Sequence, residues 1–489
     1  MPTLSFPPYE IDVRRHVLLR DGVTVDLSPR LVEILGHLAA HHGETITKES
    51  LLDRFWPDVH VTENTLTRAI ADIRHALEDD ASTPRFIQTV ARRGYRFIAQ
   101  SFHGPQVIVD KADIDPFREW VKGRLSLERL DANQLDEALA AFKRAVTATP
   151  AYAPAHAGLA NAYFLQYERT RFKNIPARDL LELATSHARQ TCELDPSLGE
   201  AWATLGFILT ASGDVEQARA AARRATALEP SSWRHQFRLA VATWGEERLR
   251  AVDRTLTLMP DFAPARFVAG MVFVARQAFD TAEDLFARGA SRQSQQADAN
   301  DALFPSFGLH WLHGLLLLRR AAIGDALRAF TREIDSARES NIYSAEFRLN
   351  AVVASGFAHL AARDADGALR AFRSALELHH ANARALIGLT RALVSLDATD
   401  EATHVLRRTD QARNELVTGG RLAEATLVAA AAESASGRTD VAIQRLERLL
   451  DQAPPGQIGW QIPIDPALAL LREHPAYDRL TARLAARAS

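Results

Sequence analysis

The apolar and polar positions of the N-terminal segment alternate in the manner of short strands. Between Tyr9 and Leu27 the sequence is rich in β-branched residues and contains an Asp-Gly pair, Asp21 and Gly22. Alternation around such a pair is typical of strands joined by tight turns. We therefore expect a small antiparallel sheet at the start of the chain.

Apolar residues then recur at helical spacing in three successive segments. The first helix is predicted to follow Ser28, which can cap it, and to end at Gly43. The second follows Thr47 and is short, because Pro57 stops it. The third is predicted to begin at Thr62, and its apolar residues form one stripe that should be buried. The stripe consists of Leu66, Ile70, Ile73 and Leu77.

The opposite face of the third predicted helix is polar and chemically mixed. It carries an amide, a hydroxyl, two guanidinium groups and an imidazole, which belong to Asn64, Thr67, Arg68, Arg74 and His75. After this helix, the runs FIQTV and YRFIA flank the tetrapeptide ARRG. This arrangement predicts a β-hairpin whose tip is basic.

A sheet, three helices and a basic hairpin in this order resemble a winged helix-turn-helix. The sequence is similar to the output domain of the OmpR/PhoB class, and more closely to the ToxR, CadC and HilA group, in which that domain is N-terminal. The segments SPRLVEIL, LLDRFWPD, VTENTLTRAIADIRHALEDD and FIQTVARRGYRF carry the resemblance. It implies that the third helix enters the major groove of DNA, and that the hairpin, or wing, touches the minor groove and the backbone.

The resemblance and the side-chain chemistry together predict which residues contact DNA. Asn64 can bond adenine bidentately and Arg68 can bond guanine, while Thr67 is short enough to meet a thymine methyl group or a phosphate. A helix face that is merely solvated is the alternative, and the basic hairpin beside it argues for DNA. The predicted contact set is Thr62, Asn64, Thr65, Thr67, Arg68, Arg74, His75, Arg92, Arg93 and Gly94.

The wing and the end of the third helix are expected to contact the DNA backbone. Arg92 and Arg93, with Arg74 and His75, suit phosphates or the narrow groove, where negative potential is concentrated. Gly94 is expected to permit the tight turn.

The charge of the N-terminal domain is not basic overall. Residues 1–101 contain 12 Lys and Arg against 14 Asp and Glu, a net charge of −2, whereas residues 81–101 contain four arginines and no acid. Positive charge is therefore local to the wing. Modest affinity for a single site follows, and dimeric or tandem half-sites would compensate for it.

The loop between the second and third helices has a second implied role. In the OmpR/PhoB class this loop contacts RNA polymerase, and Asp58, Val59 and His60 occupy it in this sequence. A plain turn is the alternative, which the residues leave open.

The rest of the chain is repetitive. In a 34-residue frame, Trp202, Gly206, Ala218, Ala222 and Pro230 fall on positions 4, 8, 20, 24 and 32, which is the tetratricopeptide pattern. The frame recurs to give about nine units. The predicted domains are a winged-helix domain at 1–100, a linker at 101–116, the repeat array at 117–456 and capping helices at 457–489.

Tetratricopeptide arrays form a concave groove, lined by the first helix of each repeat, that binds peptides or proteins. The residues predicted to line it are Phe207, Phe267, Met271, Trp311 and Phe357. Because these are apolar, we expect an apolar partner segment or a small effector there. Packing of these side chains against neighbouring turns is the alternative.

Composition and motifs give little support to enzymatic chemistry. The single cysteine, Cys192, excludes an intramolecular disulfide, and the paired histidines lack a third ligand, so neither metal nor cofactor is expected. Phosphate-binding loops and nucleophile elbows are missing from the sequence. Carboxylate-rich stretches such as Glu78 to Asp80 are expected to be solvated.

The sequence thus predicts an α+β winged helix-turn-helix domain followed by an all-α tetratricopeptide superhelix, an α-solenoid. We expect a cytoplasmic, bacterial-type transcriptional regulator that binds promoter DNA, with RNA polymerase and a second copy of the chain as further partners. No stretch suits a membrane helix. The alternative is a signalling scaffold whose winged helix docks a protein instead of DNA.

Overall fold

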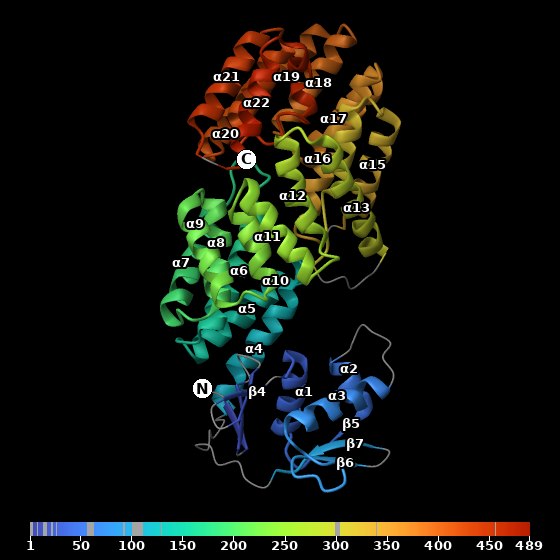
Figure 1. The fold of residues 1–489 in the computed structure, drawn as a ribbon. Coiled ribbons are helices and arrows are strands. Elements are labelled where there is room, and N and C mark those ends of the chain that lie inside the picture. The colour runs from blue at the N-terminus through green and yellow to red at the C-terminus, as the bar shows by residue number, and fades with distance from the viewer. Residues whose placement is uncertain are drawn as a thin grey trace. The chain divides into compact units, whose positions relative to one another are not determined.

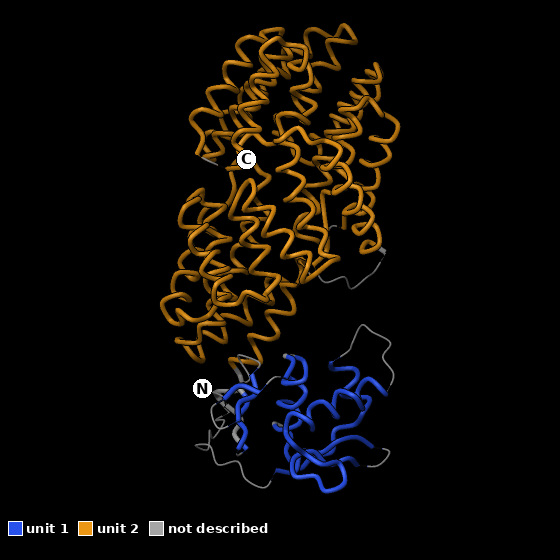
Figure 2. The backbone as a smooth tube through the Cα atoms, in the orientation of Figure 1, with its two compact units in different colours: residues 1–112 blue, residues 113–489 orange. Residues whose placement is uncertain are grey.

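The computed structural model describes residues 3–6, 8–12, 17–20, 23–25, 27–55, 63–90, 93–99, 111–128, 130–298, 304–338, 340–454 and 456–489. The chain divides into two compact units, Met1–Ala112 and Asp113–Ser489 (Figure 2).

Unit 1 combines two antiparallel sheets with helices (Figure 1). Its elements are β1 (Thr3–Phe6), β2 (Tyr9–Asp12), β3 (Val17–Arg20), β4 (Val23–Val25), α1 (Pro29–Ala40), β5 (Thr45–Thr47), α2 (Lys48–Phe55), α3 (Glu63–Ala76), β6 (Ile87–Val90) and β7 (Gly94–Phe97). The strand orders are β1-β2-β3-β4 and β5-β7-β6. The second sheet contains the predicted wing hairpin, in which Val90 is opposite Gly94.

Local chemistry explains the helices of unit 1. Pro29 is the first residue of α1, and the hydroxyl of Thr47 accepts a hydrogen bond from the Ser50 amide at 3.1 Å at the start of α2. All four apolar stripe residues of α3 are buried, which confirms that prediction. Strand β5 was not predicted, because its three residues are too short to show alternation.

Unit 2 is a succession of helix pairs (Figure 1). Its helices are α4 (Lys111–Glu128), α5 (Ala132–Ala148), α6 (Ala153–Glu168), α7 (Arg178–Leu194), α8 (Gly199–Ser212), α9 (Val215–Leu228), α10 (Trp233–Ala242), α11 (Gly245–Leu258), α12 (Ala263–Ala275), α13 (Phe279–Asp298), α14 (Leu309–Arg319), α15 (Ile323–Ser336), α16 (Ser344–Ala361), α17 (Ala365–Leu378), α18 (Ala383–Ser395), α19 (Thr399–Thr418), α20 (Leu422–Ala435), α21 (Thr439–Gln452), the 3₁₀ helix η1 (Pro466–Glu473) and α22 (Tyr477–Arg487). Helix α4 begins inside the segment predicted as a linker and contains Pro116. None of the described helices combines the length and apolar character needed to cross a bilayer.

Glycines let the paired helices of the repeats approach each other. A Cβ atom at Gly356 in α16 would lie 2.6 Å from the ring of Phe372 in α17, so any side chain there would displace the ring. In these repeats a glycine on the first helix therefore faces a phenylalanine ring on the second, and the ring fills the space that a side chain would occupy. Equivalent pairs are Gly270 with Phe286 and Gly314 with Phe330.

The last residues of the chain lie along the first helices of several repeats. Helix η1 contacts α14, α16, α18 and α20, and Ile464 belongs to the core that α14 and α16 share. Arg384 of α18 forms ion pairs with Asp465 at 3.2 Å and with Glu424 at 3.3 Å. We expected residues 457–489 to cap the end of the array, whereas this segment also covers helices of earlier repeats.

Candidate nucleic-acid interface

The outward face of α3 is polar and exposed. Asn64, Arg68 and His75 are exposed and recur at intervals of four and seven residues, so they share one face of the helix. Thr67 is exposed beside them, and Thr65 is half-buried. Because the opposite stripe is buried in the core of unit 1, this helix is anchored with its polar face outward.

Arg74 is half-buried, and its side chain reaches strand β6. Its Nη2 donates hydrogen bonds to the carbonyl oxygen of Ile87 at 2.8 Å and to the hydroxyl of Thr89 at 2.9 Å. This side chain therefore ties the end of α3 to the first strand of the wing. Its role as a phosphate contact stays a prediction, because the two bonds engage only Nη2 of the guanidinium.

The wing places Arg93 at the surface. Arg93 is exposed, and its backbone amide donates to the carbonyl oxygen of Val90 at 3.0 Å, which closes the turn. Gly94 follows in β7 and is buried. A Cβ atom at Gly94 would lie 1.9 Å from the carbonyl oxygen of Ile46, so this glycine is needed for the close approach of β5. Its role thus differs from the predicted one in the turn.

Asp79 anchors the start of the wing, and its role was missed in the sequence. Its carboxylate accepts hydrogen bonds from the amides of Arg85 at 2.6 Å, Phe86 at 3.2 Å and Ile87 at 2.9 Å. Asp79 is only 8% exposed, so the expectation that Glu78 to Asp80 are all solvated is wrong. The signal available in the sequence was a carboxylate between a helix end and a strand.

Acidic and basic groups alternate near the exposed face of α3. Asp72 is exposed one helical turn after Arg68, which weakens the positive potential there.

Arg96 of the wing donates two hydrogen bonds to the Thr45 hydroxyl, at 3.1 and 2.7 Å, and so supports the sheet. Burial and the neighbouring Arg54 lower the pKa of His37, on α1, to about 4.

Several predicted site residues lie outside the described residues. The ones affected are Thr62, Arg92 and the loop residues Asp58, Val59 and His60.

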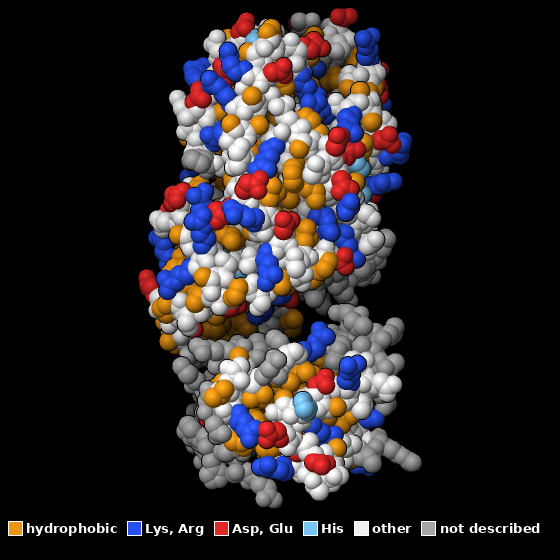
Figure 3. All heavy atoms as spheres, viewed as in Figure 1, with side chains coloured by type: hydrophobic (Ala, Val, Ile, Leu, Met, Phe, Trp, Pro, Cys, Tyr) orange, Lys and Arg blue, Asp and Glu red, His pale blue; other side chains and the backbone are white. Residues whose placement is uncertain are grey.

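The predicted groove residues of unit 2 pack against other side chains of the same chain. Met271 and Phe357 are 7% and 3% exposed, and the other three are half-buried. These contacts favour the packing alternative over an open apolar groove. The ring pairs are Phe207 with Phe164 and Phe357 with Phe372, both at 5.1 Å, and Phe267 and Trp311 with Phe347, both at 6.0 Å. In Figure 3, acidic and basic side chains are interspersed over the visible face of unit 2.

Comparison with known proteins finds family models that match segments within both units. The family model described as transcriptional regulatory protein, C terminal, matches residues 22–97. Residues 22–97 form an OmpR/PhoB-type transcriptional regulatory domain. Tetratricopeptide repeat models match residues 199–232 and 359–416, within unit 2. The predicted combination of these two domain types is thereby confirmed.

Named relatives of the regulatory domain are bacterial regulators. The chain is 36% identical over 80 residues to the transcriptional activator CadC of Escherichia coli, covering 16% of each chain. It is 35% identical over 105 residues to the transcriptional regulator HilA of Salmonella typhimurium, covering 21% of this chain and 19% of HilA. The chain thus spans less than a fifth of either relative. The crystal structure of the Klebsiella pneumoniae RstA DNA-binding domain with the RstA box is 30% identical, with a TM-score of 0.19, covering 20% of this chain and 99% of that one.

Proposed function

We propose that this chain is a sequence-specific transcriptional regulator whose helix α3 reads bases in the major groove of promoter DNA. The observation that carries the proposal is the exposed face of α3, where Asn64 and Arg68 stand one turn apart on a helix fixed by its buried stripe. An amide and a guanidinium are the groups best suited to bidentate recognition of adenine and guanine. Their placement inside an OmpR/PhoB-type domain supports this role.

The wing would fix the register of the domain on DNA. Arg93 is exposed at its turn and suits a phosphate or the minor groove. Arg74 and Asp79 hold the wing against α3 and thus position it. We further propose that Asp58, Val59 and His60 contact RNA polymerase, and that two copies bind paired half-sites.

Unit 2 would supply the regulatory input in the cytoplasm. Tetratricopeptide arrays bind proteins, peptides or effectors through extended surfaces. We propose that an effector or partner bound to unit 2 controls the regulatory domain.

Selection of duplexes from a random pool by the full-length chain tests the DNA-binding proposal. One enriched motif is expected, and Arg68→Ala should weaken its binding by about 1–3 kcal/mol, because one bidentate base contact is lost. Arg30→Ala, which removes an exposed positive charge from α1, is the matched control and should change affinity little.

The result also discriminates between the two classes of function. Absence of any enriched motif, or equal affinity of the Arg68→Ala variant and the parent, would favour a scaffold whose winged helix docks a protein.

A further inference from the structure

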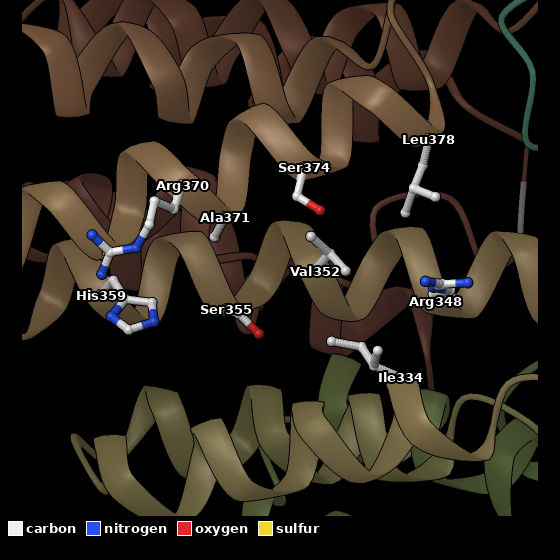
Figure 4. Close-up of a pocket in the computed structure, with 10 residues that line it drawn as sticks. Ile334, Arg348, Val352, Ser355, His359, Arg370, Ala371, Ser374 and Leu378 are labelled. Carbon is white, nitrogen blue, oxygen red and sulfur yellow. The ribbon is translucent and has the colours of Figure 1, made fainter.

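An open pocket of about 390 Å³ is lined by residues of α15, α16 and α17 of unit 2. Figure 4 shows Arg348 at one end of it and Arg370 with His359 at the other. Val352 and Ala371 lie between the two ends. The pocket therefore has basic groups at both ends, whereas its middle combines Val352 and Ala371 with the hydroxyls of Ser355 and Ser374. Its size is that of a small-molecule site.

The guanidinium group of Arg348 has no ion-pair partner in the part of the chain that the structure describes. The Nε of Arg348 is buried and has no hydrogen-bond acceptor. Among the described residues, neither Arg348 nor Arg370 forms an ion pair. Buried polar atoms of this kind are costly unless an acceptor reaches them, so an acceptor from outside the chain would stabilise the Arg348 end.

The two ends of the pocket differ in positive electrostatic potential. At the second end, Nδ1 of His359 is 2.9 Å from Oδ2 of Asp364, and this carboxylate also lies close enough to Arg370 to interact with it electrostatically. Positive potential is thus reduced there. Arg348 provides the stronger anion site.

We propose that this pocket binds an elongated small molecule with an acidic group at each end and an apolar chain between them. Arg348 and His359 are eleven residues apart on α16, which is about 16 Å along the helix axis. An α,ω-dicarboxylate of that length places one carboxylate at Arg348 and the other at Arg370, with its methylene chain along Val352 and Ala371. This site is separate from DNA recognition and adds a ligand class to unit 2.

Calorimetric titration of the full-length chain tests the site without DNA. The probes are dodecanedioate, dodecanoate and dimethyl dodecanedioate, and affinity should fall in that order because carboxylates are removed one at a time. Arg348→Gln should lower the affinity for dodecanedioate about tenfold, as expected for loss of a charge-assisted contact. Arg370→Gln should lower this affinity less.

Arg373→Gln is the matched control, since it removes a charge from the same helix α17 at an exposed position that pairs with Glu401. Its affinity should equal that of the parent chain. Thermal unfolding of each variant establishes that it is folded, and Arg370→Gln tests the site even if Arg348→Gln unfolds. No binding of dodecanedioate, equal affinity for the three probes, or unchanged affinity in both pocket variants would overturn the proposal. None of these results bears on DNA binding.

Discussion

Two surfaces were candidates for binding a partner: the outward face of α3 and the inner face of the repeats, which the first helix of each repeat lines. They differ in exposure. On α3, Asn64, Arg68 and His75 remain exposed. On the first helices of the repeats, Met271 and Phe357 are buried by the chain itself.

This difference shows what each kind of residue says about function. An apolar residue on a repeat helix gains free energy from any apolar neighbour, and its own chain supplies one. A guanidinium or amide on an exposed helix gains nothing comparable from packing, so its presence on a fixed helix is the more informative sign of a partner.

The largest expected effect tests whether Phe357, a predicted groove residue, is held by packing against Phe372, whose ring lies 5.1 Å away. Phe372→Ala removes a ring that fills the space beside Gly356 and Gly388, and should lower the free energy of unfolding by about 3–5 kcal/mol. Urea unfolding measures this loss. Arg373→Ala, at the next and exposed position, should cost less than about 0.5 kcal/mol. Equal effects of the two substitutions would contradict the packing of Phe372 between the paired helices.

A smaller loss of stability is expected from a substitution in unit 1. Gly94→Ala forces a methyl group against the Ile46 carbonyl and should destabilise unit 1 by about 3 kcal/mol. Urea unfolding followed by a probe within the first hundred residues measures it. Gly36→Ala is the control, because a Cβ atom at Gly36 would meet no atom within 4 Å. If Gly94→Ala unfolds as the parent does, the close approach of β5 to the wing is wrong.

The pH dependence of unit 2 should be weaker still. Burial, with the neighbouring Arg332 and His313, lowers the pKa of His310 to about 4, below the value of about 6.5 in an unfolded chain. Between these values the unfolded state binds more protons, so His310 destabilises unit 2 progressively as pH falls from 6.5 toward 4. Unfolding at pH 7.5 and 5.5 measures the drop, and His310→Gln should reduce it. An unchanged drop would exclude this histidine as the cause.

Local patterns predicted the helices of unit 1 well. The stripe of α3 and the short helix after Thr47 depend on residues a few positions apart, whereas Ser28, which was expected to cap α1, makes no side-chain capping bond. The glycines of the repeats were also recognisable, because their spacing from the paired rings is fixed by the repeat.

The unpredicted features depend on contacts between distant residues. Arg384 meets Asp465 across 81 positions, and this contact places the C-terminal segment along the repeats. Strand β5 exists through its pairing with β7, where Ile46 is opposite Tyr95. Periodicity within a short window carries no information on such pairings.

The account rests on base recognition by α3, which one measurement tests most directly. Affinities for the enriched motif and for its single base-pair variants would be compared in the parent, Arg68→Ala and Arg93→Gln chains over a range of salt concentrations. Arg68→Ala should lose the preference at one base-pair position, whereas Arg93→Gln should weaken all duplexes alike and reduce the salt slope by about one. If Arg68→Ala kept the full preference at every position, α3 would not read the bases and the central claim would be wrong.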